Sequence, residues 1–527
     1  MPRRRLEQGL VALPAAVAFG LLVFRLVRDV HGKPLIEDEA VAGLIGARPL
    51  GELLGIVLSD RGAAPLHFLL VHAVLALDSS ASALRWLSVA FAIGAVLLCV
   101  ELGRRLGGPV AGAAAGIAGA TSGLLTIYGT VARMYALFAF VGALAAVLFV
   151  RALERRTGEA AFTAALAAWL LPAAHPYGGI AVAAEAVIAL YLWRGRPLRP
   201  ALPALAVGAA MLPFAFVDLR LAHRFDVGGQ GRSLAGPGET WHQLHLVIQG
   251  SAGGSGLPLV VFLALAVVGI ATLVRDRPAV AVLMALWLLA PPLLFLTVQS
   301  QSSPDLSPRH LIYALPLWAA AIGVGAARLL SRFEVRAQAL ALGALVAAAA
   351  FGSTGVHDPR EITFPAGLGA EQELAAPAAA LRKEIEPGDV LFPYSSVHLA
   401  ALPASAHAQT LPRAEPEVLA RALRRVELPA GSLFVSVPVA GTQIRLDQLR
   451  DRLGAGYVVQ RLGGWLILER RGPMRDRAAI AASIAKILRE GQAATMLRNE
   501  ITLAGYYRLG IAVADGAERR LRLDRAG

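Results

Sequence analysis

Residues 84–127 read LRWLSVAFAIGAVLLCVELGRRLGGPVAGAAAGIAGATSGLLTI, two apolar runs joined by a polar turn that contains Arg104 and Arg105. Each run has about 20 residues, the length with which an α-helix crosses the hydrocarbon core of a bilayer. Short turns rich in Arg are typical of the cytoplasmic side of a membrane protein. The stretch therefore predicts two spanning helices that are connected in the cytoplasm.

The composition of the whole chain indicates the same class of protein. Of its 527 residues, 56% are hydrophobic and 17% are charged, and the mean hydropathy is +0.59. A soluble domain of this size needs more charge to cover its surface. The formal net charge is +13, but the Arg residues fall in short clusters between apolar runs, so a nucleic acid is not an expected partner. The single cysteine, Cys99, excludes an internal disulfide.

Similar apolar runs recur along the first two thirds of the chain. The first of them follows Met1-Pro2-Arg3-Arg4-Arg5 without a convincing small-residue cleavage site, so we interpret it as a retained helix rather than a signal peptide. We expect about eleven spans from this pattern. They lie near residues 9–28, 84–103, 109–127, 132–151, 160–176, 177–193, 199–218, 256–274, 279–298, 310–328 and 336–354.

The apolar run 64–77 decides the orientation of the helices. It is shorter than a usual span, and we place it in the outer interface of the membrane. The Arg clusters of the later turns then all lie in the cytoplasm with the N-terminus. Counting 64–77 as a span moves nearly all of them outside, against the positive-inside rule. The clusters are Arg104-Arg105, Arg151 with Arg155-Arg156, Arg194 with Arg196 and Arg199, Arg275 with Arg277, and Arg328 with Arg332 and Arg336.

The outer side receives the longer polar segments, which are the loops 31–83, 219–255 and 299–309 and everything after about 355. We expect residues 1–355 to form the transmembrane domain and residues 356–527 to form a small extracytoplasmic α/β domain of unknown role. In that domain Pro, Arg and Glu become common and no run is long enough to span. The pattern predicts strands at Asp389–Tyr394, Ser432–Val437 and Tyr457–Leu468, and helices at 414–425, 443–453 and 475–498.

Three consecutive acids, Glu37-Asp38-Glu39, follow the first span on the outer side. Carboxylates at this position suit a general base or a cation site. The alternative is a solvated loop that also helps to orient the helix. A further acid, Glu185, lies inside a predicted span, where it either serves a proton or ion pathway or hydrogen-bonds a neighbouring helix.

Basic and aromatic residues gather in three outer turns. Arg guanidinium groups match phosphate geometry, so these turns suit the recognition of a phosphate at the level of the lipid headgroups. The alternative is that the Arg side chains only extend to the headgroups, and that the His is structural. The residues concerned are Arg133 and Tyr135, His175 and Tyr177, and Arg309 and His310. The sequence contains no P-loop, HExxH or CxxC pair, which argues against nucleotide, zinc-protease and thiol chemistry.

The order of these motifs resembles the GT-C superfamily of membrane glycosyltransferases, in the bacterial branch related to protein O-mannosyltransferases and the lipid A aminoarabinose transferase. The resemblance covers residues 31–318. It rests on Ile36-Glu37-Asp38-Glu39-Ala40, Ala64–His72, Ala83–Ser88, Gly103-Arg104-Arg105-Leu106, Ala132–Leu137, His175-Pro176-Tyr177-Gly178 and Pro308–Pro316. It implies a polytopic α-helical fold of the GT-C type with interfacial helices in the first outer loop.

The resemblance also implies a reaction and roles for residues. Such enzymes transfer a sugar from a polyprenyl phosphate, at the outer face of the membrane, to a lipid, glycan or protein acceptor. Asp38, with Glu39 beside it, takes the place of the catalytic base, and Arg133 and Arg309 stabilise the departing phosphate. Two departures concern the site, because Val131 replaces a familiar acid and Ala63-Ala64-Pro65 replaces His-Pro-Pro. The first departure leaves open whether there is a metal site, for which a divalent ion is the candidate cofactor.

Two other classes of function remain open at this stage. A transporter or lipid flippase predicts ionisable residues near the middle of the membrane and paired broken helices, for which Glu185 is slight support. A non-catalytic membrane scaffold predicts an outer domain that binds a partner. Substitution of Asp38 distinguishes the enzyme from both, because only the enzyme loses turnover.

Overall fold

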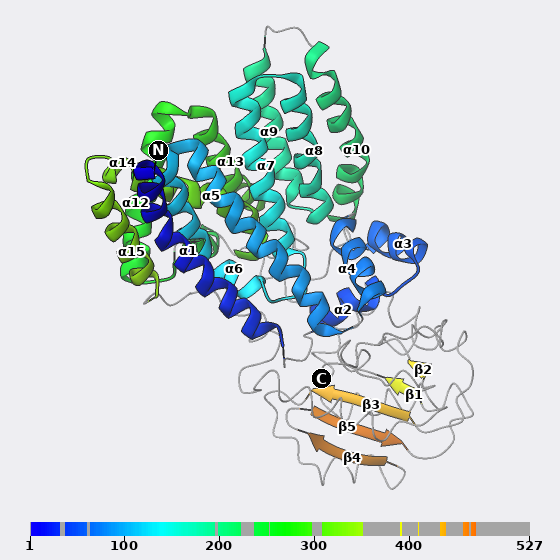
Figure 1. Ribbon diagram of the computed structural model, residues 1–527. Helices are drawn as coiled ribbons and strands as arrows, with labels where there is room; N and C mark the ends of the chain where they lie inside the picture. The colour runs from blue at the N-terminus through cyan, green and yellow to red at the C-terminus, as the bar shows by residue number, and fades with distance from the viewer. Residues whose placement is uncertain are drawn as a thin grey trace.

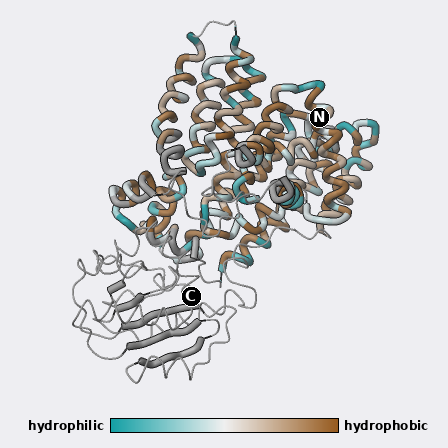
Figure 2. Tube along the Cα trace, turned by 180° about the vertical axis from the view of Figure 1, so that it is seen from behind, coloured by the Kyte–Doolittle hydropathy of each residue, from teal (hydrophilic) through white to brown (hydrophobic). Residues whose placement is uncertain are grey.

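The protein is a bundle of α-helices, followed in the chain by a small β-sheet (Figure 1). The computed structural model describes residues 2–31, 37–60, 64–78, 80–194, 199–222, 237–251, 253–297, 308–350, 390–392, 409–410, 433–438, 457–462 and 465–470. In the bundle, hydrophobic residues run along the helices and hydrophilic residues lie mainly at their ends (Figure 2). This distribution is the one that a lipid bilayer requires.

The apolar runs expected to span the membrane are helical over most of their length. Five helical segments in the described part are long and apolar enough to cross a bilayer, and six shorter apolar helices accompany them. The chain is therefore a polytopic α-helical membrane protein, whereas the number of spans stays a prediction. The helices of the bundle are α1 (Pro2–Val30), α5 (Ala81–Ala120), α7 (Tyr135–Arg155), α8 (Gly158–Ala174), α9 (Gly178–Trp193), α10 (Leu202–Ala222), α12 (Leu257–Asp276), α13 (Pro278–Thr297), α14 (Leu315–Leu330) and α15 (Val335–Ala350).

Helix α5 contains two of the expected spans. It breaks at Gly108, whose φ of 83° lies in the region that favours glycine, and at Pro109, which has no N–H to continue the helix. The two arms then lie against each other. A Cβ at Gly103 would be 2.6 Å from the carbonyl oxygen of Ala111, so only glycine permits this approach. The second arm ends at Ala120 instead of near 127, and Ser122 caps the short helix α6 (Gly123–Tyr128).

Small residues also bring α12 and α14 together. Cβ atoms added at Gly269 or Gly325 would collide with backbone atoms of Ala321 and Leu265, respectively. Close backbone approach through Gly and Ala is the usual basis of helix association in membranes, where lipid is as apolar as the side chains. The buried core of the bundle is accordingly rich in Ala.

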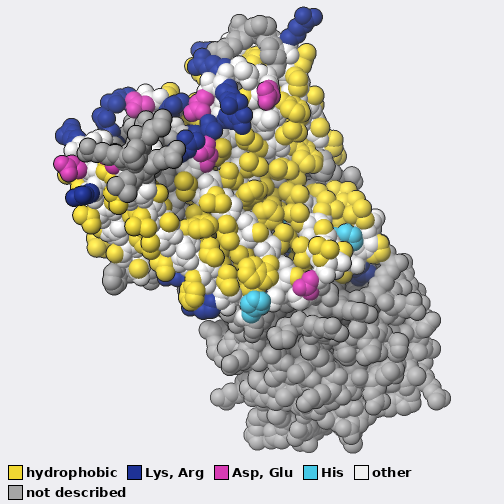
Figure 3. Space-filling model, in the orientation of Figure 1, with side chains coloured by type: hydrophobic (Ala, Val, Ile, Leu, Met, Phe, Trp, Pro, Cys, Tyr) yellow, Lys and Arg dark blue, Asp and Glu magenta, His cyan; other side chains and the backbone are white. Residues whose placement is uncertain are grey.

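One end of the bundle carries the Arg-rich turns. Glu101 pairs with Arg104 at 2.8 Å, and Glu154 pairs with Arg105 at 3.0 Å and with Arg277 at 3.9 Å, so the break in α5 and the ends of α7 and α12 meet there. Figure 3 shows Lys and Arg gathered at this end, above a largely hydrophobic flank. Such exposed pairs add little to stability. The turns expected in the cytoplasm thus lie together, and the side of the membrane they face stays a prediction.

Shorter helices build the opposite end. The first outer loop contains α2 (Glu37–Gly46), α3 (Leu50–Asp60) and α4 (Pro65–Leu77), which agrees with the interfacial helices expected there. The expected long outer loop 219–255 contains a further helix, α11 (Pro237–Ser251). Two 3-10 helices complete the bundle, η1 (Arg199–Ala201) and η2 (Pro308–Ala314), and the second of these leads directly into α14.

The C-terminal sheet has the strand order β2-β1-β3-β5-β4, where β1 pairs in parallel with β2 and β3, and the other neighbours are antiparallel. The expected strand Tyr457–Leu468 is wrong as a single element, because it forms two paired strands on either side of Gly463-Gly464. The helices expected at 414–425, 443–453 and 475–498 lie outside the described residues. The strands are β1 (Val390–Phe392), β2 (Gln409–Thr410), β3 (Leu433–Pro438), β4 (Tyr457–Leu462) and β5 (Trp465–Arg470).

Candidate functional site

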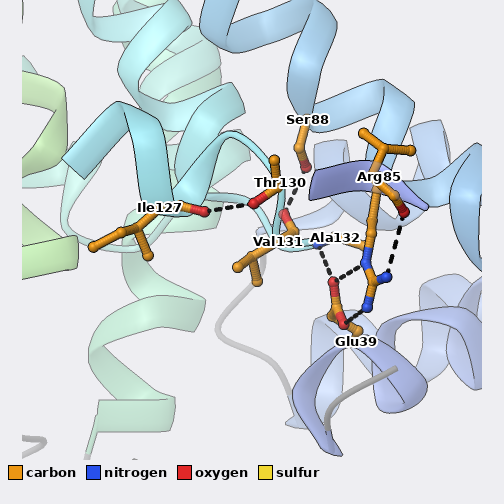
Figure 4. Close-up of polar contacts among 8 residues, drawn as sticks. Glu39, Arg85, Ser88, Ile127, Thr130, Val131 and Ala132 are labelled. Carbon is orange, nitrogen blue, oxygen red and sulfur yellow. Dashed lines mark hydrogen bonds and ion pairs between the residues drawn. The ribbon is translucent and has the colours of Figure 1, made fainter. Parts of the chain in front are cut away.

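The candidate site forms around the turn 129–134, between α6 and α7 (Figure 4). The turn starts at Gly129, where a Cβ would lie 2.5 Å from the Leu125 carbonyl oxygen and 2.8 Å from the Leu26 side chain. The Ser88 hydroxyl then donates a hydrogen bond to the Val131 carbonyl over 2.7 Å. The close packing at position 129 therefore requires glycine, and the Ser88 hydroxyl from α5 fixes the position of the turn at Val131.

A buried ion pair connects this turn to the first outer loop. Arg85 donates to both carboxylate oxygens of Glu39, from Nε over 3.0 Å and from Nη2 over 2.8 Å (Figure 4). The Ala132 N–H donates to the same carboxylate over 2.7 Å. The side chains are 0% exposed for Glu39 and 1% exposed for Arg85. A bidentate pair of this kind fixes orientation as well as distance. Together with the Ala132 bond, it fixes the positions of α2, α5 and the turn relative to one another.

The two acids expected to be catalytic are placed differently. The Glu39 carboxylate is enclosed and holds three hydrogen bonds, an arrangement that suits positioning of α2 better than proton transfer to a substrate. Asp38 lies in α2, one residue earlier, and its side chain is outside the described part of the structure. The catalytic roles of Asp38 and Glu39 stay predictions.

The six residues expected to bind substrate come together beside the turn. The His175 ring lies 6.1 Å from Tyr135, 5.3 Å from Tyr177 and 5.4 Å from His310, measured between ring centroids. Tyr177 and His310 stack at 4.9 Å, and the Arg309 guanidinium lies 5.6 Å from the centroid of the Tyr135 ring. The start of α7, the turn between α8 and α9, and η2 thus contribute to one cluster. Their role in binding stays a prediction.

The turn between α8 and α9 is as tight as expected. Helix α8 ends at Ala174, and His175 adopts the extended conformation that a residue before proline prefers. The Tyr177 N–H donates to Nδ1 of His175 over 3.2 Å, so Nδ1 is unprotonated and Nε2 carries the proton in the neutral ring. A Cβ at Gly178 would collide with the Leu171 backbone, which leaves room only for glycine.

The cluster is electrically positive. Burial, together with the nearby charges of Arg133 and Arg309, lowers the pKa of His175 to about 3. The same effects of burial and of Arg133 lower the pKa of His67, on α4, to about 3. Both rings are therefore neutral at physiological pH. Two guanidinium groups and an imidazole N–H are the donors that stabilise an oxyanion.

The low pKa of His175 predicts how stability depends on pH. Between pH of about 6.5 and 3, the unfolded chain binds a proton at this ring and the folded protein does not, so stability falls as the pH is lowered. The variant His175→Phe is expected to lose less stability than the wild type over the same fall in pH. The check is the unfolding midpoint in detergent over this pH range, with exposed His242→Phe as the control. An unchanged slope in His175→Phe would contradict the assignment.

Sequence reasoning gave no role to Arg85 or His67. Arg85 carried a usable signal, since a charge at the start of an apolar run is costly unless it has a partner. His67 carried none, because its role depends on contacts made only in the fold. Glu185 is buried in α9 as expected, and its Oε1 has no partner among the described residues. No group of three potential metal ligands occurs among the described side chains, which do not include Asp38.

Comparisons with known proteins bear on the fold. No protein-family model matches the sequence, and no curated protein matches it either. Among solved structures, ArnT from Cupriavidus metallidurans in the apo state superposes with a TM-score of 0.55 at 14% identity, over 88% of this chain and 98% of that one. The chain has the GT-C fold.

The same relative with a ligand gives an equivalent match. ArnT bound to undecaprenyl phosphate superposes with a TM-score of 0.54 over the same shares of the two chains. A weaker similarity extends to the oligosaccharyltransferase of Archaeoglobus fulgidus, with a TM-score of 0.45 and 12% identity over 82% of this chain and 69% of that one. The superposition on ArnT confirms the GT-C fold expected from the motif order.

Proposed function

We propose that the protein is a membrane glycosyltransferase that moves a sugar from a polyprenyl phosphate to a lipid, glycan or protein acceptor of the cell envelope. The observation that carries the proposal is the convergence of Arg133, Arg309 and His175 at the end of the bundle where the first outer loop docks. The ArnT structure with undecaprenyl phosphate supports a polyprenyl phosphate as the lipid, because that protein has the same fold.

The positive cluster suits the leaving group of this reaction. When the bond between the anomeric carbon and the phosphate oxygen breaks, negative charge develops on the polyprenyl phosphate. Guanidinium groups of Arg133 and Arg309, and the N–H of neutral His175, are donors that stabilise such charge in a site of low polarity. The stacked rings of Tyr177 and His310, with Tyr135 beside them, offer an apolar face for a sugar ring.

The base of the proposed reaction is Asp38. Its carboxylate takes the proton of the acceptor hydroxyl, whose oxygen attacks the anomeric carbon while the polyprenyl phosphate leaves with its electron pair. Attack from the side opposite the phosphate inverts the configuration of the sugar. Glu39 serves this step indirectly, since its pair with Arg85 anchors α2, the helix that carries Asp38. Glu39 is thus a positioning residue in the proposal.

The proposed location is a bacterial inner membrane, with the N-terminus in the cytoplasm and the C-terminal domain outside. The Arg-rich turns support this orientation, because they lie together at the end away from the candidate site. Partners are then the polyprenyl-phosphate sugar, the acceptor and the bilayer.

Transfer of a labelled sugar tests the proposal directly. The purified protein in lipid vesicles is supplied with a panel of polyprenyl-phosphate-linked pentoses and hexoses and with membrane acceptors. We expect transfer from at least one donor, and about a hundredfold loss in Arg133→Gln, because donors to a developing oxyanion contribute on this order. Arg332→Gln, exposed in the turn after α14, is the matched control and should be unaffected. Absence of transfer from every donor would overturn the proposal and favour a transporter or scaffold.

A further inference from the structure

A buried hydrogen bond joins η2, the 3-10 helix that carries Arg309 and His310, to α13. The Tyr313 hydroxyl donates to the Trp287 backbone carbonyl over 2.8 Å, and both residues are 0% exposed. Neither of them belongs to the cluster that is proposed to bind substrate. Because buried polar groups with satisfied partners specify one arrangement of the elements that carry them, this bond fixes where η2 lies against α13.

A proline explains why the Trp287 carbonyl is available to Tyr313. In an α-helix this carbonyl normally accepts from the N–H of the residue four positions later, but that residue is Pro291, which has no N–H. The Tyr313 hydroxyl supplies the donor that the proline lacks. The Trp287 side chain is itself fixed, because its Nε1 donates to the Ala181 carbonyl of α9 over 3.2 Å. The acceptor for Tyr313 therefore lies where α13 is also bonded to α9.

The other side of η2 lies along α7, which contributes to the candidate site. The Arg309 guanidinium lies 5.6 Å from the centroid of the Tyr135 ring, and the Tyr313 ring lies 4.9 Å from that of Phe138, one turn further along α7. A Cβ at Gly142 would collide with the Tyr313 carbonyl, so the two backbones touch there. The short helix is thus enclosed between α7 and α13, and a shift at Tyr313 is transmitted to Arg309.

We propose that Tyr313 is a positioning residue for sugar transfer, whose hydroxyl holds η2 at the place where Arg309 stabilises the phosphate leaving group. This inference rests on the proposed function and deepens it, because it gives a part in the reaction to a hydroxyl that bonds the protein backbone and not the substrate. A displacement of about 1 Å in a catalytic group can lower the rate about a hundredfold, so a bond at the far end of η2 can affect turnover.

A double-mutant cycle with Arg309 tests the proposal. Tyr313→Phe keeps the ring and removes only the hydroxyl, so we expect about a ten- to a hundredfold loss of kcat in transfer of a labelled sugar, with little change in KM. In the Arg309→Gln background the same substitution should cost less than about twofold, because the group that it positions is absent. The unfolding midpoint in detergent should fall equally in both backgrounds, since the same hydrogen bond is lost.

Thr272→Val is the matched control, because the Thr272 hydroxyl also donates to a helix carbonyl, that of Val268 in α12, at the same distance of 2.8 Å. It should leave kcat unchanged in either background. An equal loss of kcat from Tyr313→Phe in both backgrounds would show that the hydroxyl only supports the fold, and would overturn the inference. Full kcat in Tyr313→Phe would overturn it as well. Both of these results leave the proposed function standing, whereas failure of the wild type to transfer any sugar overturns that function and the inference with it.

Discussion

Replacement of Asp38 by Asn is expected to lower the rate of sugar transfer by about a hundred- to ten-thousand-fold, the usual contribution of a general base. Asn has nearly the same shape and cannot accept the proton of the acceptor hydroxyl. The helix α2 should persist, because its anchor is the neighbouring Glu39 with Arg85. The check is the initial rate of transfer of a labelled sugar in lipid vesicles, measured with the unfolding midpoint of each preparation.

Asp78→Asn is the control for this result. Asp78 is an exposed acid that follows α4, and its carboxylate accepts hydrogen bonds from Ser80 at the start of α5. We expect its transfer rate to stay close to that of the wild type. Equal transfer by Asp38→Asn and wild type would contradict Asp38 as the base, and Glu37→Gln would then be the next variant to measure.

The helices of the bundle were predictable because one physical requirement dominates them. A span needs enough consecutive apolar residues to cross the bilayer, and that length is visible in the sequence. Short helices such as α3 and α11 have no such requirement, and their formation depends on what they pack against. The strand pair β4 and β5 was predicted as one strand, although Gly463-Gly464 between them was a usable turn signal.

The candidate site was predictable to the extent that it depends on topology. His175 and Arg309 are far apart in the sequence, but both were expected in outer turns, and the structure brings them to one cluster. Pairings inside the cluster were not predictable. The sequence did not indicate that Glu39 pairs with Arg85 instead of acting as a second catalytic acid. The pairing depends on the burial of both side chains and on the path of the turn at Ala132.

Breaking the ion pair between Arg85 and Glu39 is expected to have the largest effect on stability. Arg85→Met removes the charged donor that bonds both oxygens of the buried Glu39 carboxylate. Breaking a buried pair leaves a charge without compensation and costs about 3–5 kcal/mol of the free energy of unfolding. The check is the unfolding midpoint in detergent. Arg28→Met is the control, because Arg28 forms an ion pair with Asp29 at a similar distance of 2.9 Å but is 63% exposed. It should change the midpoint little.

The double variant Arg85→Met with Glu39→Leu separates stability from positioning. Replacement of both partners by apolar residues removes the unpaired charge, so most of the stability lost in Arg85→Met should return. Transfer activity should not return with it, because α2 is no longer held to Arg85 by a bidentate pair or to the Ala132 N–H by a hydrogen bond, and Asp38 loses its fixed orientation. Measured as kcat against KM, the remaining defect should lie in kcat. Recovery of both stability and kcat would show that the pair only stabilises the fold and does not position the base.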